Sequence, residues 1–180
     1  GYTGAGSRIA IIDTGADVDH PSLDPDALKY ALQGSNATIM TEADLTDEVL
    51  NQLNAYTRKA GLTAADFYVN EKIPFGFNYV DADTDITHDN DTQGDHGSHV
   101  TGIAAGNRFV KDEAGNYVAA LDSVMTQGVA PDAQILTMKV FGKGGGAYDS
   151  DYMVAIEDAV MLGCDAVNLS LGSGNAGFTT

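Results

Sequence analysis

The 180-residue chain has few basic residues, one cysteine and no long apolar run, and each shortage excludes a class of protein. Only 9 lysines and arginines stand against 26 aspartates and glutamates, which gives a formal net charge of −17. Nucleic acids and anionic membranes are bound by basic surfaces, so this composition argues against both. We therefore expect no nucleic-acid partner, and the acidity favours solubility, cation binding or cationic partners.

The single cysteine and the short apolar runs exclude two further kinds of structure. Cys164 has no second cysteine for an internal disulfide, and its apolar neighbours indicate a small buried side chain rather than a reactive thiol. No apolar run approaches the roughly 18 residues of a transmembrane helix, and the first residues carry no signal-peptide pattern. We expect no direct membrane insertion, and we expect any export or anchoring signal to lie outside this chain.

The pattern of apolar residues predicts an α/β fold in a single domain. At 180 residues, 43% of them hydrophobic and 21 of them glycine, the chain can bury one core and make many tight turns. Short apolar runs predict four strands, at residues 7–13, 74–80, 134–141 and 166–171. Helices are predicted between them, at residues 99–105 and 149–162. Such alternation is typical of a mostly parallel sheet flanked by helices.

Two polar motifs lie where such a fold places its functional groups. Ile11-Ile12-Asp13-Thr14-Gly15 puts a carboxylate at the carboxyl end of a buried strand. Asp95-His96-Gly97-Ser98-His99-Val100-Thr101-Gly102 puts an imidazole at the start of a helix. A serine hydroxyl becomes a nucleophile when an imidazole takes its proton and a carboxylate orients the imidazole. Taken alone, the aspartate is often a helix cap and the histidine a satisfied polar group; together they indicate Asp13 as the orienting carboxylate and His96 as the general base.

In this order the two motifs resemble those of the subtilisin-like serine peptidases, or subtilases, whose triad runs Asp, His, Ser. The stretches FNYVDADTD, TMKVF and AIEDAVMLGCDAVNLSLGS resemble those of the large cell-envelope subtilases of Gram-positive bacteria, the lactocepin and C5a-peptidase group. The resemblance implies a three-layer subtilisin-like fold, incomplete here, with residues 1–180 as the N-terminal portion of a catalytic domain. It also implies a protein or peptide substrate, and a secreted or cell-wall-associated protein of a Gram-positive bacterium.

The resemblance further implies two walls of a substrate cleft. The family's cleft-edge segment, which binds the substrate backbone as an added antiparallel strand, is matched by Gly144, Gly145 and Gly146. The opposite wall, which lines the pocket for the residue before the scissile bond, is matched by Ser170, Leu171 and Gly172. Without the two catalytic motifs, each segment would be interpreted as a flexible loop or a strand-to-turn junction.

The third member of the triad has no match in this chain. None of its serines stands in the family's Gly-Thr-Ser nucleophile motif, and Asn168 and Asn175 come too early to be the family's oxyanion-hole asparagine. We therefore expect a serine-bearing remainder of the catalytic domain, as a continuation beyond Thr180 or as a second chain. The alternative is a catalytically inactive pseudo-protease module that binds peptides without cleaving them.

A dinucleotide-binding domain is a third alternative, prompted by Gly4-Ala5-Gly6. These glycines precede the first predicted strand, whereas a phosphate-binding loop follows its strand and opens a helix. The order of the elements therefore argues against this alternative.

An acidic run raises the question of a structural calcium ion. Asp81, Asp83 and Asp85 form a D-x-D-x-D run whose oxygens suit calcium, although the sequence lacks the glycine and the final glutamate of an EF-hand. Ser22 stands where subtilases often carry an aspartate ligand. The two interpretations are a solvated acidic loop and a calcium site, and the chemistry itself requires no cofactor.

His96 and His99 raise the separate question of a zinc site. They lack the i, i+4 spacing and the third ligand of such a site on a helix. In the resemblance the second histidine is structural.

Residues from about 24 to 91 separate the two motifs more widely than in a minimal subtilase, and we expect an insertion there. Within it, residues 41–61 predict one capped amphipathic helix, with Leu45, Val49 and Leu53 on one side and Gly61 as its stop. Such a helix could be a lid, a wall of the substrate cleft or a surface appendage.

Overall fold

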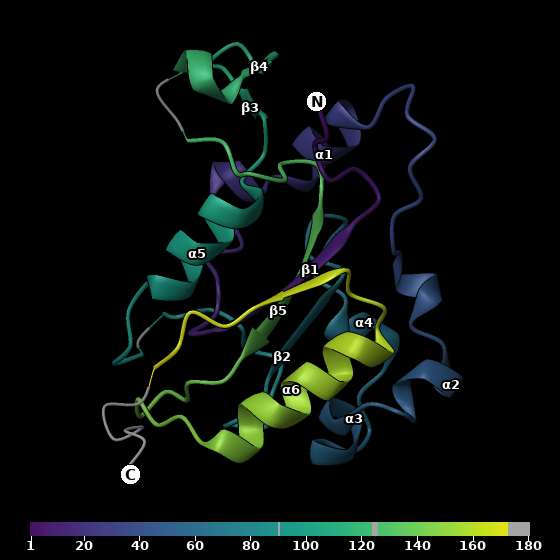
Figure 1. The fold of residues 1–180 in the computed structure, drawn as a ribbon, viewed down its shortest axis with the longest axis vertical. Coiled ribbons are helices and arrows are strands. Elements are labelled where there is room, and N and C mark those ends of the chain that lie inside the picture. The colour runs from purple at the N-terminus through teal and green to yellow at the C-terminus, as the bar shows by residue number, and fades with distance from the viewer. Residues whose placement is uncertain (90, 124–125, 173–180) are drawn as a thin grey trace, which may run out of the picture.

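The centre of the molecule is a four-stranded parallel sheet with the strand order β2-β5-β1-β6 (Figure 1). The computed structural model describes residues 1–89, 91–123 and 126–172. The strands of the sheet are β1 (Arg8–Asp13), β2 (Phe75–Asn78), β5 (Gln134–Lys139) and β6 (Ala166–Asn168). The predicted parallel α/β sheet is confirmed, and its last three strands end two or three residues earlier than predicted.

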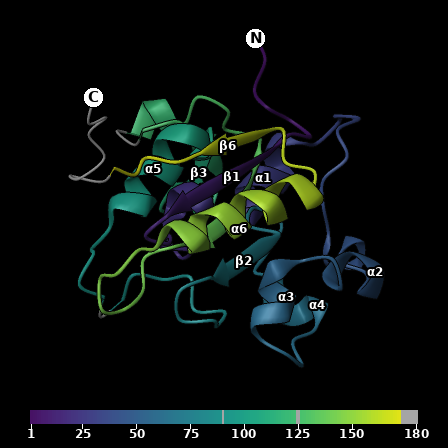
Figure 2. The same cartoon turned by 60° about the horizontal axis from the view of Figure 1, so that its bottom comes forward.

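Helices cover both faces of this sheet, so the fold has three layers (Figures 1 and 2). Helix α5 (His96–Ala105) packs on one face, where Ile11 and Ile135 join Ala105 in one buried cluster. Helix α6 (Asp149–Met161) packs on the other face, where the core includes Ala10, Ile12, Leu136, Met138, Ala155 and Ala159. Consecutive strand residues point to opposite faces, which is why short runs of continuous apolar sequence fill both clusters.

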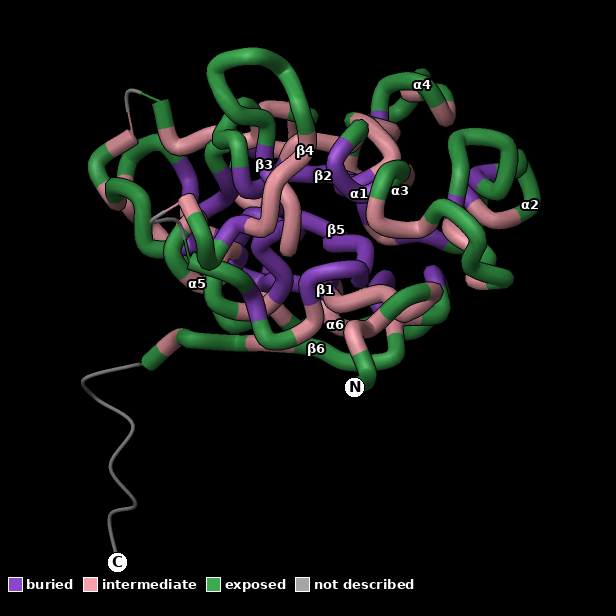
Figure 3. The backbone as a smooth tube through the Cα atoms, turned by 90° about the horizontal axis from the view of Figure 1, so that it is seen from above, coloured by how far each residue is buried: buried purple, intermediate pink, exposed green. Residues whose placement is uncertain are grey.

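The burial of the sheet is uneven (Figure 3). All residues of β2 and β5 are buried, whereas β6 is exposed at Ala166 and Val167. In the part of the chain that the structure describes, β6 pairs only with β1.

Short elements connect this framework. They are η1 (Pro21–Leu23), α1 (Pro25–Ala31), η2 (Glu42–Asp44), α2 (Asp47–Leu50), α3 (Asn54–Arg58), α4 (Ala64–Phe67), β3 (Phe109–Lys111), β4 (Tyr117–Ala119) and η3 (Ala120–Ser123). Strands β3 and β4 form an antiparallel hairpin beside α1, where the ring of Tyr30 stacks on Tyr117 with 4.6 Å between ring centroids. Of the helices described, none combines the length and the apolar character that crossing a membrane would need.

The prediction of one helix over residues 41–61 is wrong. The capping box at its start exists, since the Thr41 amide donates to the Asp44 carboxylate at 2.7 Å, but the helix that follows is only η2. The chain then makes two further short helices, α2 and α3, separated by Leu53 in an extended conformation. In this broken arrangement the three leucines at positions 45, 50 and 53 are all buried.

A buried carboxylate on α6 explains where α3 begins. Asp158 is 0% exposed, and it accepts hydrogen bonds from the amides of Asn54 (2.7 Å) and Ala55 (2.9 Å) and from the Tyr79 hydroxyl (2.8 Å). The first amides of a helix have no partner within the helix, so the carboxylate acts as a cap supplied from another element. Burial and the charge of Asp158 raise the pKa of Tyr79 well above its usual value, which keeps the phenol a donor.

The segment expected to be an insertion is therefore not uniform. Its range of about 24–91 contains α1 and also β2, an edge strand of the sheet, whereas α3 packs against α6 (Figure 2). Arg58 at the end of α3 forms an ion pair with Asp151 of α6 at 2.7 Å. The role of an insertion stays a prediction, and the contacts seen for α3 are those of a structural part of the layer beside α6.

Replacing Asp158 tests whether this cap holds α3 in place. In Asp158→Asn an NH₂ group replaces one of the two carboxylate oxygens and faces hydrogen-bond donors instead of accepting from them. We therefore expect the free energy of unfolding to fall by about 2–3 kcal/mol. Denaturant titration measures the change. Glu157→Gln, at the adjacent exposed position, is the control and should change stability by less than about 0.5 kcal/mol. Equal stability of the two variants would contradict the interpretation.

Candidate active site

Asp13 and His96 are brought together at the carboxyl edge of the sheet. Asp13 is the last residue of β1, His96 is the first residue of α5, and the distance from Asp13 Oδ1 to His96 Nδ1 is 2.8 Å. The aspartate side chain is 1% exposed and the histidine side chain 53% exposed. No hydrogen bond to His96 Nε2 is found among the described residues. The pair thus has a buried carboxylate at one end and an accessible imidazole nitrogen at the other.

The residues after Asp13 hold the start of α5 against β1. The Thr14 hydroxyl accepts a hydrogen bond from the Gly97 amide at 2.9 Å, and the Thr14 amide donates to Asp13 Oδ1 at 2.7 Å. A Cβ atom on Gly97 would lie 2.1 Å from the carbonyl oxygen of Gly15. Gly97 therefore permits a close approach of the two backbones, which a larger residue would prevent. Gly15 has a φ of +108°, and a Cβ there would lie 2.3 Å from the Ile86 carbonyl oxygen, so both positions require glycine, each for its own reason.

The sequence analysis missed two charged residues next to this pair. Lys139, the last residue of β5, lies beside Asp13 in the sheet register, and its ammonium forms an ion pair with Asp91. The sequence did contain an indication of this pair: a lysine stands inside the apolar run TMKVF, and a charge in a buried strand needs a partner.

The three predicted cleft-edge glycines lie next to the segment that leads into α5. Residues 142–146 form a tight turn, in which the Gly145 amide donates to the Gly142 carbonyl at 2.8 Å. The Gln93 side chain donates to the Gly145 carbonyl at 2.6 Å, and Gly145 has a φ of +82°. The segment is therefore a turn here rather than an extended strand, because these bonds close it on itself. That Gly144, Gly145 and Gly146 bind substrate stays a prediction.

The other predicted wall follows β6. Ser170, Leu171 and Gly172 continue from the carboxyl end of β6, which lies at the same edge of the parallel sheet as Asp13. The Ser170 hydroxyl donates to the Asn168 side chain at 2.9 Å. No contact between this segment and His96 is found among the described residues. Asn175 and Ser173 lie outside the described residues, and the role of the wall stays a prediction.

The acidic run folds onto the glycine turn. Asp81 accepts hydrogen bonds from the Asn78 side chain at 2.9 Å and from the Lys143 amide at 3.0 Å. The Lys143 ammonium lies 3.3 Å from Asp85 and 3.9 Å from Asp83. Within the described ranges no three histidine, cysteine, aspartate or glutamate side chains gather closely enough to hold a metal ion. This arrangement fits a lysine as the counter-ion better than calcium.

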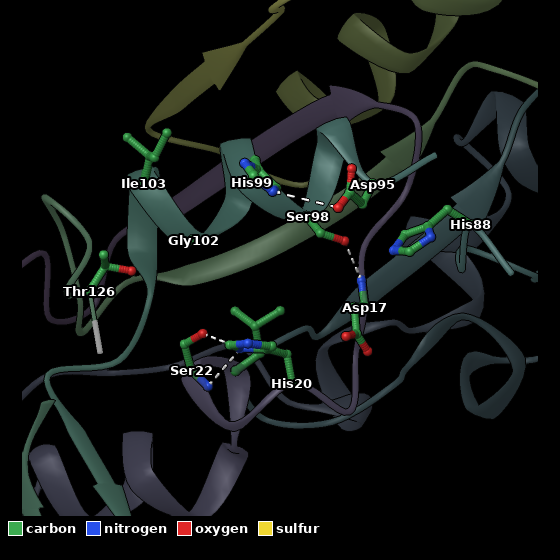
Figure 4. Close-up of a pocket in the computed structure, with 11 residues that line it drawn as sticks. Asp17, His20, Ser22, His88, Asp95, Ser98, His99, Gly102, Ile103 and Thr126 are labelled. Carbon is green, nitrogen blue, oxygen red and sulfur yellow. Dashed lines mark hydrogen bonds and ion pairs between the residues drawn. The ribbon is translucent and has the colours of Figure 1, made fainter. Parts of the chain in front are cut away.

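A cavity of about 460 Å³ flanks α5, and its lining includes neither Asp13 nor His96 (Figure 4). Its lining includes three histidines, His20, His88 and His99. His20 contacts the Ser22 hydroxyl through Nδ1, and His99 Nε2 lies 3.5 Å from an Asp95 carboxylate oxygen. In the described structure His99 is an exposed residue of α5, and its predicted structural role has no contact in the core to support it.

Comparison with known proteins identifies relatives over almost the whole chain. Residues 4–179 match the model of the subtilase family. The chain is 35% identical to the PI-type proteinase of Lactococcus lactis subsp. cremoris, over 99% of this chain and 8% of that protein. It is 30% identical to the minor extracellular protease Vpr of Bacillus subtilis (strain 168), over 96% of this chain and 15% of that protein.

It is also 30% identical to the C5a peptidase of Streptococcus pyogenes serotype M6, over 94% of this chain and 12% of that protein. The resemblance drawn from the two motifs is confirmed. The chain spans only 8% to 15% of the length of these three relatives.

The contact between Gly97 and Gly15 can be tested by adding one methyl group. In Gly97→Ala the new Cβ collides with a backbone oxygen, so we expect a loss of about 1–3 kcal/mol in the free energy of unfolding. Gly102→Ala is the matched control, because a Cβ at this position of the same helix meets nothing within 4 Å. It should be neutral or stabilising by up to about 1 kcal/mol, since alanine favours a helix. If thermal and denaturant unfolding give Gly97→Ala the stability of Gly102→Ala, the close approach is not a constraint.

Proposed function

The chain belongs to the subtilase family, and from this membership we propose that it is part of a serine endopeptidase that hydrolyses peptide bonds through an Asp-His-Ser triad. Asp13 is the carboxylate, His96 is the general base, and the serine comes from the remainder of the catalytic domain. The observation that carries the proposal is the 2.8 Å contact between a buried Asp13 and a half-exposed His96.

The geometry suits each proton transfer of this mechanism. With Nδ1–H donating to Asp13, the lone pair of His96 stands on Nε2, where it can take the proton of a serine hydroxyl as that oxygen attacks the substrate carbonyl. The imidazolium that forms is stabilised by a carboxylate in a poorly screened site. His96 then returns the proton to the leaving amine, so one histidine acts first as base and then as acid.

The substrate in this proposal is a protein or peptide, bound between the glycine turn at residues 144–146 and the segment after β6. The names of the relatives support it, since they describe proteinases and a peptidase, one of them extracellular. Secretion or attachment to the cell wall of a Gram-positive bacterium is proposed on the same basis. The alternative, a pseudo-protease that binds peptides, keeps the cleft and lacks a reactive serine.

Calcium enters the proposal only as a structural ion at Asp81, Asp83 and Asp85, and it takes no part in the chemistry. Such an ion would have to compete with the Lys143 ammonium for Asp83 and Asp85. A site predicts that millimolar calcium raises the melting temperature, and that Asp83→Ala abolishes the rise. An unchanged melting temperature would leave the run as an acidic loop neutralised by Lys143.

The catalytic roles are tested in the complete protein. In His96→Ala we expect kcat on a peptide substrate to fall on the order of 10⁴-fold or more, and in Asp13→Asn on the order of 10⁴-fold, the magnitudes known for triads of this kind. His88→Ala is the control, because no hydrogen bond or ion pair joins His88 to either residue in the described structure, and its kcat should stay within a few-fold of the wild type.

Labelling with a fluorophosphonate separates the peptidase from the alternative. The probe bonds to an activated serine, so intact mass spectrometry should find an adduct on the wild type and none on His96→Ala. Peptide binding without an adduct would favour the pseudo-protease. Full hydrolysis by His96→Ala would contradict the proposed mechanism.

A further inference from the structure

The buried ion pair between Lys139 and Asp91 lies beside the catalytic pair and has no role in the mechanism above. Lys139 is 0% exposed and the Asp91 side chain 1% exposed. Removing two charges from water costs several kcal/mol, and a pair of apolar side chains often fills such a space with equal or better stability. Stability alone is therefore a weak explanation for these two residues, and their position has to be considered.

Three segments of the active site meet at the Lys139 ammonium. The lysine itself ends β5, its Nζ donates to the carbonyl of Thr14 at 2.7 Å, and it also contacts the carboxylate of Asp91. Thr14 directly follows Asp13, and Asp91 lies five residues before His96. Val140, the residue after Lys139, also contacts this part of the site, because its amide donates to the Asp13 carbonyl at 2.9 Å.

We propose that Lys139 and Asp91 form a positioning pair, in which the ammonium ties the chain after Asp13 to the chain before His96 and thereby holds the two catalytic side chains at hydrogen-bond distance. This inference rests on the proposed peptidase function for its effect on turnover, but not for its effect on His96 itself. Neither residue touches the substrate, so both act through Asp13 and His96.

The pair also keeps the local charge balanced. The charged and titratable groups around this end of the sheet are Asp13 at the end of β1, Lys139 at the end of β5, Asp91 and Asp95 before α5, His99 on α5, and Asp17, His20 and His88, which line the cavity beside α5; Arg8 lies at the other end of β1. With Asp91 neutralised, the ammonium would be left as an uncompensated cation on the Thr14 carbonyl, one residue from the carboxylate that holds His96. With Lys139 neutralised, the Asp91 carboxylate would be left uncompensated instead, and the two changes should act on His96 in opposite directions.

The test follows the titration of His96 in the complete protein without relying on activity. Diethyl pyrocarbonate modifies the neutral imidazole. Peptide mass spectrometry at a series of pH values therefore gives, for each histidine, the midpoint, which is the pH at which modification is half of its maximum. We expect the His96 midpoint to move down by about half to one pH unit in Asp91→Asn and up by a similar amount in Lys139→Met. The double variant should return it towards the wild-type value.

Two controls distinguish an effect of charge on His96 from a general disturbance of the fold. The midpoint of His99, an exposed residue of the same helix, should change much less than that of His96 in every variant. Lys139→Arg retains the charge and should retain the wild-type His96 midpoint, even if it packs less well. Midpoints for His96 that stay within about 0.2 pH units in both single variants would overturn the proposal.

Turnover supplies the second readout. We expect kcat on a peptide substrate to fall about 10- to 100-fold in each single variant, with KM changed less than about threefold, because the pair orients the catalytic side chains rather than the substrate. A loss confined to KM would also overturn the proposal. If the wild type neither hydrolyses peptides nor reacts with a fluorophosphonate, the proposed function fails, while the His96 midpoints still decide whether the pair acts on this residue.

Discussion

The hydrogen bond from the Gly97 amide to the Thr14 hydroxyl is the contact on which the rest of the site depends. It fastens the first turn of α5 to the residue that follows Asp13, so a helix on one face of the sheet is fixed against the end of a central strand. Only glycine permits the approach, because the space that a Cβ atom would need at Gly97 is taken by the Gly15 carbonyl. Asp13 and His96 meet as a consequence of backbone geometry, and their own hydrogen bond then sets the orientation of the ring.

Several buried charged side chains of this molecule join one element to another. Asp158 joins α6 to the start of α3, and the ion pair of Lys139 with Asp91 joins β5 to the segment before α5. Lys72 does the same at the opposite end of β5, where its ammonium donates to the carbonyls of Pro131 and Ala133 and burial lowers its pKa to about 7. Each group satisfies backbone or charged partners that an apolar side chain would leave unpaired.

The sequence predicted the parts of this structure that depend on local pattern. The four strands, the helices of the two outer layers and the pair of Asp13 and His96 follow from short apolar runs and from two motifs with fixed internal spacing. The helix over residues 41–61 was not predictable in its broken form, since its interruption at Leu53 is set by Asp158, more than 100 residues away in the chain. The partnership of Lys139 with Asp91 was missed for the same reason: the sequence shows a charge in a strand but not which distant residue neutralises it.

The cap that Asp158 places on α3 has a consequence for building chimaeras from this chain. A designer who excised residues 46–58 to shorten the surface would remove both amides that Asp158 holds, and with Arg58 the partner of Asp151. Asp151 would then lose its ion-pair partner at a buried position, and the buried Asp158 would keep the Tyr79 hydroxyl but lose both backbone donors. The segment and the helix therefore form one exchangeable module, and a graft in either direction has to carry both, or to replace Asp151 and Asp158 with neutral residues in the same step.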